Sequence, residues 1–181
     1  MLISNEWLKD YVNVDQSVQA LAERITRTGI EVDDIIDYTK DIKKLVVGHV
    51  LSKTPHPDAD KLNICQVDLG EEEPVQIVCG APNVDEGQHV IVAKVGGRLP
   101  GGIKIKRAKL RGERSEGMIC SLQEIGISSH VTPKNYESGI YVFPEAVKPG
   151  TDALEALYLN DQVMEFDLTP NRADALSMVG T

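Results

Sequence analysis

The chain has 181 residues, of which 41% are hydrophobic and 26% charged, and its formal net charge is −9. This length and composition allow a buried core in one domain or in two small ones. No apolar run approaches the roughly 20 residues of a membrane span, and the first residues do not resemble a signal peptide, so we expect a cytoplasmic protein without membrane contact. The negative charge disfavours polyphosphate binding unless basic residues are concentrated locally.

The first 38 residues predict two helices and a strand. Ser4 can cap a short helical turn that runs through Tyr11, and Asp15 can cap a second helix that ends near Thr28. Gly29 can supply the left-handed residue that commonly follows a helix. Residues 30–38 then predict a strand, although the alternation of apolar and polar residues is imperfect.

Residues 39–150 consist of short apolar runs separated by Gly, Pro, Asn and Asp, which is typical of a small sandwich or barrel. Ser121 and Glu124 have the spacing of a capping box, and Gly126 can end the short helical turn that they begin. A five-stranded barrel with one short helix between strands is an OB-fold, and we predict that fold here. The expected strands are 45–52, 61–69, 75–80, 88–95, 103–110, 116–120 and 139–143.

Residues 151–181 predict a helix capped by Thr151, a half-buried strand at 162–168 and the start of a further helix that is truncated at Thr181. Neither end of the chain can bury much surface alone. We therefore predict that residues 1–38 and 151–181 form one small α/β unit, in which strands 30–38 and 162–168 pair. The predicted fold class is mainly β, with an OB-fold barrel of residues 39–150 inserted into this discontinuous unit.

Catalytic and metal sites are not indicated. Cys65, Cys79 and Cys120 each lie in an apolar run, which predicts reduced, packed thiols. Residues 56–60 carry one His and two Asp, but a proline interrupts regular ligand spacing and favours a rigid polar loop. The glycine-rich residues 96–102 lack the ending of a P-loop and predict a hairpin. No Ser, Cys or Thr has a nucleophile setting, so we predict no catalytic residue, metal or cofactor in this chain.

One segment is strongly basic. Between residues 94 and 114 eight basic residues stand against one acidic residue, which leaves 11 basic and 27 acidic residues in the rest of the chain. Because residues two apart on a strand share a face, we expect the predicted strand 103–110, with a phase shift near Arg107 and Ala108, to present its cations to solvent. The segment's basic residues are Lys94, Arg98, Lys104, Lys106, Arg107, Lys109, Arg111 and Arg114, and the expected core side of the strand is Ile103, Ile105, Ala108 and Leu110.

Such an array suits a sugar-phosphate backbone, because each neutralised phosphate adds affinity through counterion release. A basic strand can also be only a solvated face. With 4% aromatic residues, the chain lacks an array of stacking platforms for single-stranded bases. The composition therefore favours recognition of backbone and shape, as in a folded RNA.

Several blocks of the sequence resemble the tRNA-binding domain of the endothelial-monocyte-activating-polypeptide type. They are His-Pro-Asp-Ala-Asp-Lys-Leu at 56–62, Ile-Val-Cys-Gly-Ala-Pro-Asn at 77–83, Ala-Lys-Leu-Arg-Gly at 108–112 and Ser-Glu-Gly-Met-Ile-Cys-Ser at 115–121. The flanking segments 4–12, 28–32 and 166–177 resemble the start of bacterial phenylalanyl-tRNA synthetase β subunits. With these flanks the resemblance covers the whole chain.

The resemblance implies a full enzyme that is an α2β2 heterotetramer and uses ATP and magnesium to charge the phenylalanine tRNA. It places synthesis on the α subunit and editing further along the β subunit, so neither centre is expected in this chain, whose isolated form is expected to be monomeric. The implied role of the barrel is auxiliary tRNA contact through Lys61, Asn63, Lys104, Lys106, Lys109, Arg111 and Ser121. The basic segment adds Arg98, Arg107 and Arg114 as candidates.

Two other functions remain open at this stage. The barrel can be a structural or subunit-contact module with little affinity for RNA, which the overall acidity favours. It can also belong to a free-standing tRNA-binding or chaperone-like protein, which the flanking segments disfavour.

Overall fold

The structure is a computed structural model that describes all residues from Met1 to Thr181. The chain divides into two compact units. We call residues 1–40 and 159–181 the terminal unit, and residues 41–158 the central unit. No helix of the chain is long and apolar enough to cross a membrane.

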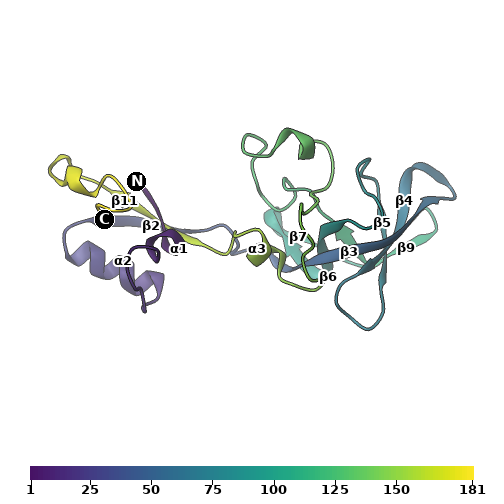
Figure 1. The fold of residues 1–181 in the computed structure, drawn as a ribbon, viewed down its shortest axis with the longest axis horizontal. Coiled ribbons are helices and arrows are strands. Elements are labelled where there is room, and N and C mark those ends of the chain that lie inside the picture. Colours follow the sequence, from purple (N-terminus) through teal and green to yellow (C-terminus); the bar gives the residue numbers. More distant parts are fainter. The chain divides into compact units, whose positions relative to one another are not determined.

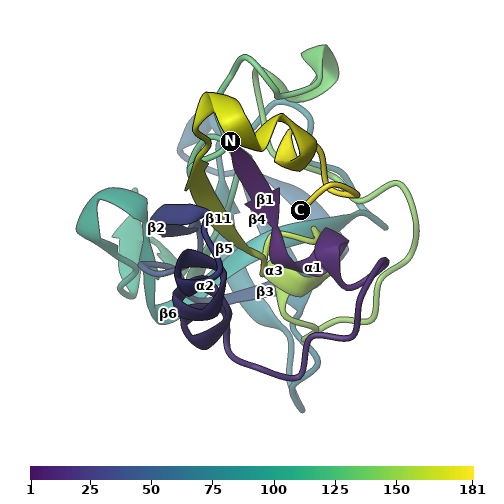
Figure 2. The same ribbon diagram turned by 90° about the vertical axis from the view of Figure 1, so that its left-hand side faces the viewer.

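The terminal unit contains a three-stranded antiparallel sheet with strand order β1-β11-β2. The purple N-terminal and yellow C-terminal segments lie side by side in it (Figures 1 and 2). The predicted pairing of strands 30–38 and 162–168 is confirmed, whereas β1 was not predicted. The elements of this unit are β1 (Leu2–Ser4), α1 (Asn5–Leu8), α2 (Val18–Arg27), β2 (Glu31–Asp37), β11 (Gln162–Asp167) and the 3-10 helix η3 (Pro170–Ala175).

Local side-chain hydrogen bonds set the helix starts of the terminal unit. Ser4 caps α1 as predicted, because its Oγ accepts from the backbone N–H of Trp7. The cap of α2 is Ser17, whose Oγ accepts from Ala20 N–H, so the prediction of Asp15 was wrong. Met164 and Phe166 of β11 are buried, and they pack with residues of β1, α1, α2 and η3 in one core.

The central unit is an antiparallel sheet with strand order β10-β6-β3-β4-β5, with β7 paired to β6 and a separate hairpin of β8 and β9. The unit is mainly β, as predicted. Its edge strands β5 and β10 do not form a ladder, but Gln76 O accepts one backbone hydrogen bond from Glu116 N–H at 2.8 Å. The elements are β3 (Lys43–His56), β4 (Ala59–Asp68), β5 (Val75–Cys79), β6 (His89–Leu99), η1 (Pro100–Gly102), β7 (Ile103–Lys104), β8 (Ala108–Leu110), β9 (Glu113–Ser115), β10 (Gly117–Ile119), η2 (Lys134–Tyr136) and α3 (Ala153–Ala156).

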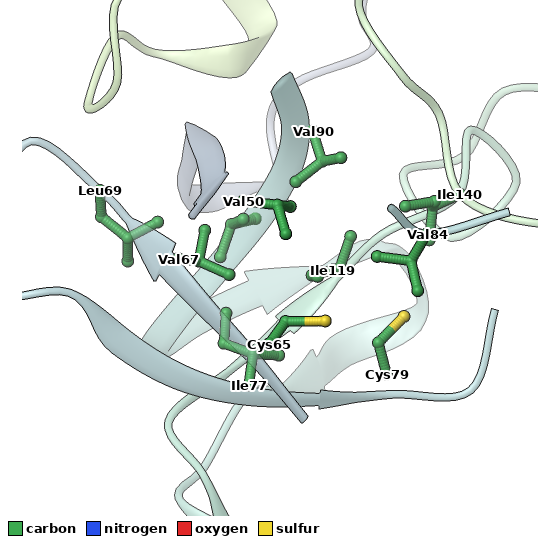
Figure 3. Close-up of a cluster of buried hydrophobic side chains, with 11 residues drawn as sticks. Val50, Cys65, Val67, Leu69, Ile77, Cys79, Val84, Val90, Ile119 and Ile140 are labelled. Atoms are coloured by element: carbon green, nitrogen blue, oxygen red, sulfur yellow. The ribbon is translucent and has the colours of Figure 1, made fainter. Parts of the chain in front are cut away.

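A cluster of branched aliphatic side chains and cysteines forms a core of the central unit (Figure 3). Cys65, Cys79 and Cys120 are free and buried, which confirms the prediction of reduced, packed thiols. Burial raises the pKa of Cys65 to about 11 and that of Cys120 to about 12, so both thiols stay protonated at neutral pH.

Other local predictions for the central unit met mixed outcomes. The capping box is present, because Ser121 N–H and Oγ donate to Glu124 Oε2 while Glu124 N–H donates to Ser121 Oγ. The helix α3 is capped by Asp152, so the prediction of Thr151 as its cap was wrong. Residues 139–143 form no strand and contribute only an isolated bridge between Val142 and Val90.

Candidate nucleic-acid interface

The basic segment is not one strand but parts of two hairpins. Ile105 exchanges backbone hydrogen bonds with Gly96 and Gly97, after which the chain leaves β6 and β8 pairs with β9 instead. Of the four residues expected on the core side, only Ile105 is buried. Ile103 and Leu110 are 56% and 40% exposed and Ala108 is exposed, so that part of the prediction was wrong. The physical reason is that Ala108 and Leu110 lie on a separate two-stranded hairpin and Ile103 on a two-residue edge strand, where little of the protein covers their side chains.

Each hairpin places two cations directly opposite each other. Arg98 pairs with Lys104 across β6 and β7, and Lys109 pairs with Arg114 across β8 and β9. Directly opposed residues of an antiparallel pair share a face, with Cβ atoms about 5 Å apart, and like charges there are destabilising. Two such pairs raise the energy of the free protein, and a bound anion would lower it.

No carboxylate of the protein relieves this repulsion. None of the six ion pairs in the structure involves Lys61, Arg98, Lys104, Lys106, Lys109, Arg111 or Arg114. Arg107 differs, because its Nε lies 3.4 Å from Glu116 Oε1, and Lys94 pairs with Glu71. The unpaired cations are all exposed, so phosphate groups can reach them without breaking a contact within the protein.

Arg111 occupies the tip of the β8–β9 hairpin in an unfavourable backbone conformation. Leu110 and Glu113 are the last paired residues, so Arg111 and Gly112 form a two-residue loop. Their φ angles are 46° and 97°. Positive φ at both positions defines a type I′ turn, for which Asn-Gly is the preferred sequence. The left-handed conformation costs an arginine about 1–3 kcal/mol, more than it costs an asparagine.

Four hydrogen bonds, made by the side chains of His56, Gln76 and Ser115, dock this hairpin onto the sheet. His56 is 5% exposed, and its Nε2 lies 3.1 Å from Leu110 O while its Nδ1 accepts from Asp58 N–H at 3.0 Å. We therefore assign the proton to Nε2, which donates to Leu110. Gln76 Nε2 donates to Glu113 and to Arg114 O, and Ser115 Oγ accepts from Val78 N–H. The contacts of His56 and Gln76 were not predicted, since neither residue has a nearby partner along the sequence.

The remaining candidates fall into different surroundings. Lys61 and Arg111 line one hollow of about 430 Å³ together with Asp58 and Asp60. Asn63 lies half-buried on β4, opposite Pro55 and Cys79, and its side chain has no hydrogen-bond partner. Lys106 and Arg107 are exposed in the link between the hairpins. Ser121 is engaged with Glu124 and lines a different, larger pocket.

Replacing Arg111 by Asn is expected to raise the free energy of unfolding of the central unit by up to about 1 kcal/mol while weakening polyanion binding a few-fold. Asn tolerates the left-handed conformation, but it lacks the charge. Urea unfolding and tRNA titration of the same variant measure the two effects. Lys106→Gln is the matched control, because Lys106 is an exposed cation with an ordinary φ angle and no opposed cation across a hairpin, so its loss should weaken binding without stabilising. A loss of stability on Arg111→Asn would contradict the assignment of strain.

Residues 45–152, more than half of the chain, match the family model described as a putative tRNA binding domain. The chain belongs to this family. The matched segment of the tRNA-binding family contains both hairpins, the β3–β4 turn with His56, and the docking contacts of Gln76 and Ser115.

Curated relatives match the whole chain, including the segments on both sides of the family domain. The β subunit of phenylalanine–tRNA ligase from Staphylococcus epidermidis strain ATCC 12228 is 99% identical over 181 residues, and the Staphylococcus haemolyticus protein of the same name is 85% identical. The chain spans 23% of the length of each of these relatives.

A solved structure of a MetRS-related protein from Pyrococcus horikoshii is 23% identical and matches 63% of this chain and 90% of its own, with a TM-score of 0.42. That score is too low to establish a shared fold.

Proposed function

We propose that the central unit binds tRNA as an accessory module of a phenylalanine–tRNA ligase β subunit. The observation that carries the proposal is the presence of two directly opposed cation pairs, Arg98–Lys104 and Lys109–Arg114, without any carboxylate counterion. A folding domain gains nothing from such pairs, whereas a sugar-phosphate backbone supplies anions at regular spacing. The near-identity to proteins of that name supports the tRNA ligase context.

We propose further that the central unit is an OB-type barrel and a separate domain inserted into the terminal unit. The order of five antiparallel strands and the hydrogen bond between Glu116 and Gln76 support near-closure of such a barrel. The contacts within each unit support two domains. In this proposal the breaks in the chain lie near residues 40 and 158, the bounds of the two units.

Recognition of the RNA is proposed to be mainly through its backbone. Phosphate contacts position a nucleic acid but do not read its sequence. The interface residues of this proposal are Lys61, Asn63, Arg98, Lys104, Lys106, Arg107, Lys109, Arg111, Arg114 and Ser121. Among them Arg107 and Ser121 have the weakest support, because both are already engaged by glutamates.

The chemistry of the full enzyme lies outside these residues in our proposal. Aminoacylation would use ATP and Mg²⁺ on an α subunit of an α2β2 assembly in the cytoplasm. This chain would contribute contacts to the tRNA and no catalytic group. In isolation it would be monomeric.

Titration of labelled tRNA with the 181-residue chain over a salt series tests the proposal. We expect saturable binding whose affinity falls steeply as salt rises, because phosphate contacts release counterions. Absence of binding at low salt would instead support the second candidate, a structural module. The net charge of −9 favours that alternative.

A further inference from the structure

A pocket of the central unit lies next to the β8–β9 hairpin. Its volume is about 530 Å³. It is bounded by the loop after β5, by β10, and by the turn that begins at Ser121. Leu110 also lines it, and this residue stands between Lys109 and Arg111 in the chain. A nucleotide whose phosphates contact these cations could therefore place its base in the pocket.

Apolar side chains form one part of the pocket walls. They include Val78, Ala81, Met118, Ile119 and Ile140. Cys79, Ile119 and Ile140 also belong to the core cluster (Figure 3). The side chain of Asn83 clamps the far wall, donating to Ile140 O at 2.8 Å and accepting from Ile140 N–H at 2.9 Å. Apolar walls of this kind suit the faces of a planar base.

Two carboxylates line the pocket, beside the amide of Gln123, whose Nε2 donates to Glu137 O at 3.3 Å. Glu124 Oε2 accepts from Ser121, but its Oε1 has no partner. The carboxylate of Glu137 has neither a hydrogen bond nor an ion pair. Burial raises the pKa of the Cys79 thiol, which therefore stays neutral and adds no charge. A phosphate would be repelled here, while a group with N–H donors would be attracted.

We infer that this pocket binds one unpaired nucleobase that carries an exocyclic amino group, with the amine donating to Glu124 or Glu137. The inference rests on the proposed tRNA binding and adds to it a site of base selection. Carboxylates accept from the amino group of cytosine, whereas uracil presents a carbonyl oxygen at the same position. Unpaired bases of folded RNAs are commonly read on this edge.

Binding of oligo(C) and of oligo(U), each of about 12 residues, tests the inference. The two carry the same number of phosphates, so a difference in affinity reflects the base. We expect the 181-residue chain to bind oligo(C) roughly tenfold more tightly than oligo(U). Glu137→Gln, which disturbs no contact of the protein, and the double change with Glu124→Gln should reduce this preference. Ala81→Leu, which fills the pocket, should lower oligo(C) binding to the level of oligo(U).

Glu145→Gln is the matched control, since it removes one exposed negative charge of the same unit away from this pocket. It should leave the ratio of the two affinities unchanged. The dependence of affinity on salt should be the same for all pocket variants, because no phosphate contact is lost.

Equal, salt-dependent binding of both oligonucleotides, unaffected by the pocket variants, would overturn the base site and leave the proposed tRNA binding intact. Failure of tRNA and both oligonucleotides to bind would overturn both.

Discussion

Replacing Phe166 by Ala is expected to lower the free energy of unfolding of the terminal unit by about 3–5 kcal/mol. Phe166 is 2% exposed and packs in the core formed by β1, β11 and the helices of that unit. Its removal leaves a cavity that the surrounding side chains can only partly fill. If the two units are separate domains, the central unit should keep its stability.

The chain carries a natural probe for each unit. Trp7, its single tryptophan, lies in the terminal unit, and all three cysteines lie in the central unit. In urea, Phe166→Ala should shift the tryptophan fluorescence transition to lower concentration without shifting the exposure of the thiols to a labelling reagent. Ile77→Ala in the central core should do the opposite, at a cost of about 2–5 kcal/mol. Transitions that move together in both variants would show that the units unfold as one.

Reversing four cations of the hairpins, with Lys104, Lys106, Lys109 and Arg111 each changed to Glu, should lower tRNA affinity at least roughly 100-fold at low salt. All four are exposed and none has an ion pair. The loss combines the missing phosphate contacts with new repulsion. A fluorescence titration with labelled tRNA measures it.

The same variant should fold at least as well as the original. Two of the substitutions place a carboxylate opposite Arg98 and Arg114, and each opposite-charge pair contributes about 0.2–1 kcal/mol. A loss of binding without a loss of stability would therefore assign the effect to the interface. Lys134→Glu with Lys148→Glu, two exposed cations of the same unit outside the hairpins, is the control and should weaken binding far less.

The sequence predicted most of the sheet because the signals are local. The alternation of Met164 and Phe166 with acidic residues predicted β11, and short apolar runs predicted β3 to β6. Helix caps were harder to predict, since several neighbouring polar residues could each cap the same helix. Ser17, rather than Asp15, stands directly before the first residue of α2. The short strands β1 and β9 were missed because three residues carry too little pattern to predict a strand.

The candidate site was predicted in its charges but not in its geometry. The number of cations between Lys94 and Arg114 can be counted from the sequence. Which cations lie opposite each other in the two hairpins cannot, because it depends on where the chain leaves β6. His56 shows the same limit. Its contact with Leu110 joins residues 54 positions apart. The hairpin at Arg111-Gly112 was also missed. Type I′ turns prefer Asn-Gly, and an arginine at the first turn position is strained, so the sequence Arg-Gly does not indicate such a turn.

The salt dependence of tRNA binding, measured for the unmodified chain and for the variant with four reversed cations, tests backbone recognition most directly. Each phosphate contact contributes roughly 0.7–0.9 to the slope of log affinity against log salt. We predict that the slope of the variant is shallower by about 3, as four lost contacts require. Equal slopes for the two proteins would contradict the assignment of these hairpins as the tRNA-binding surface.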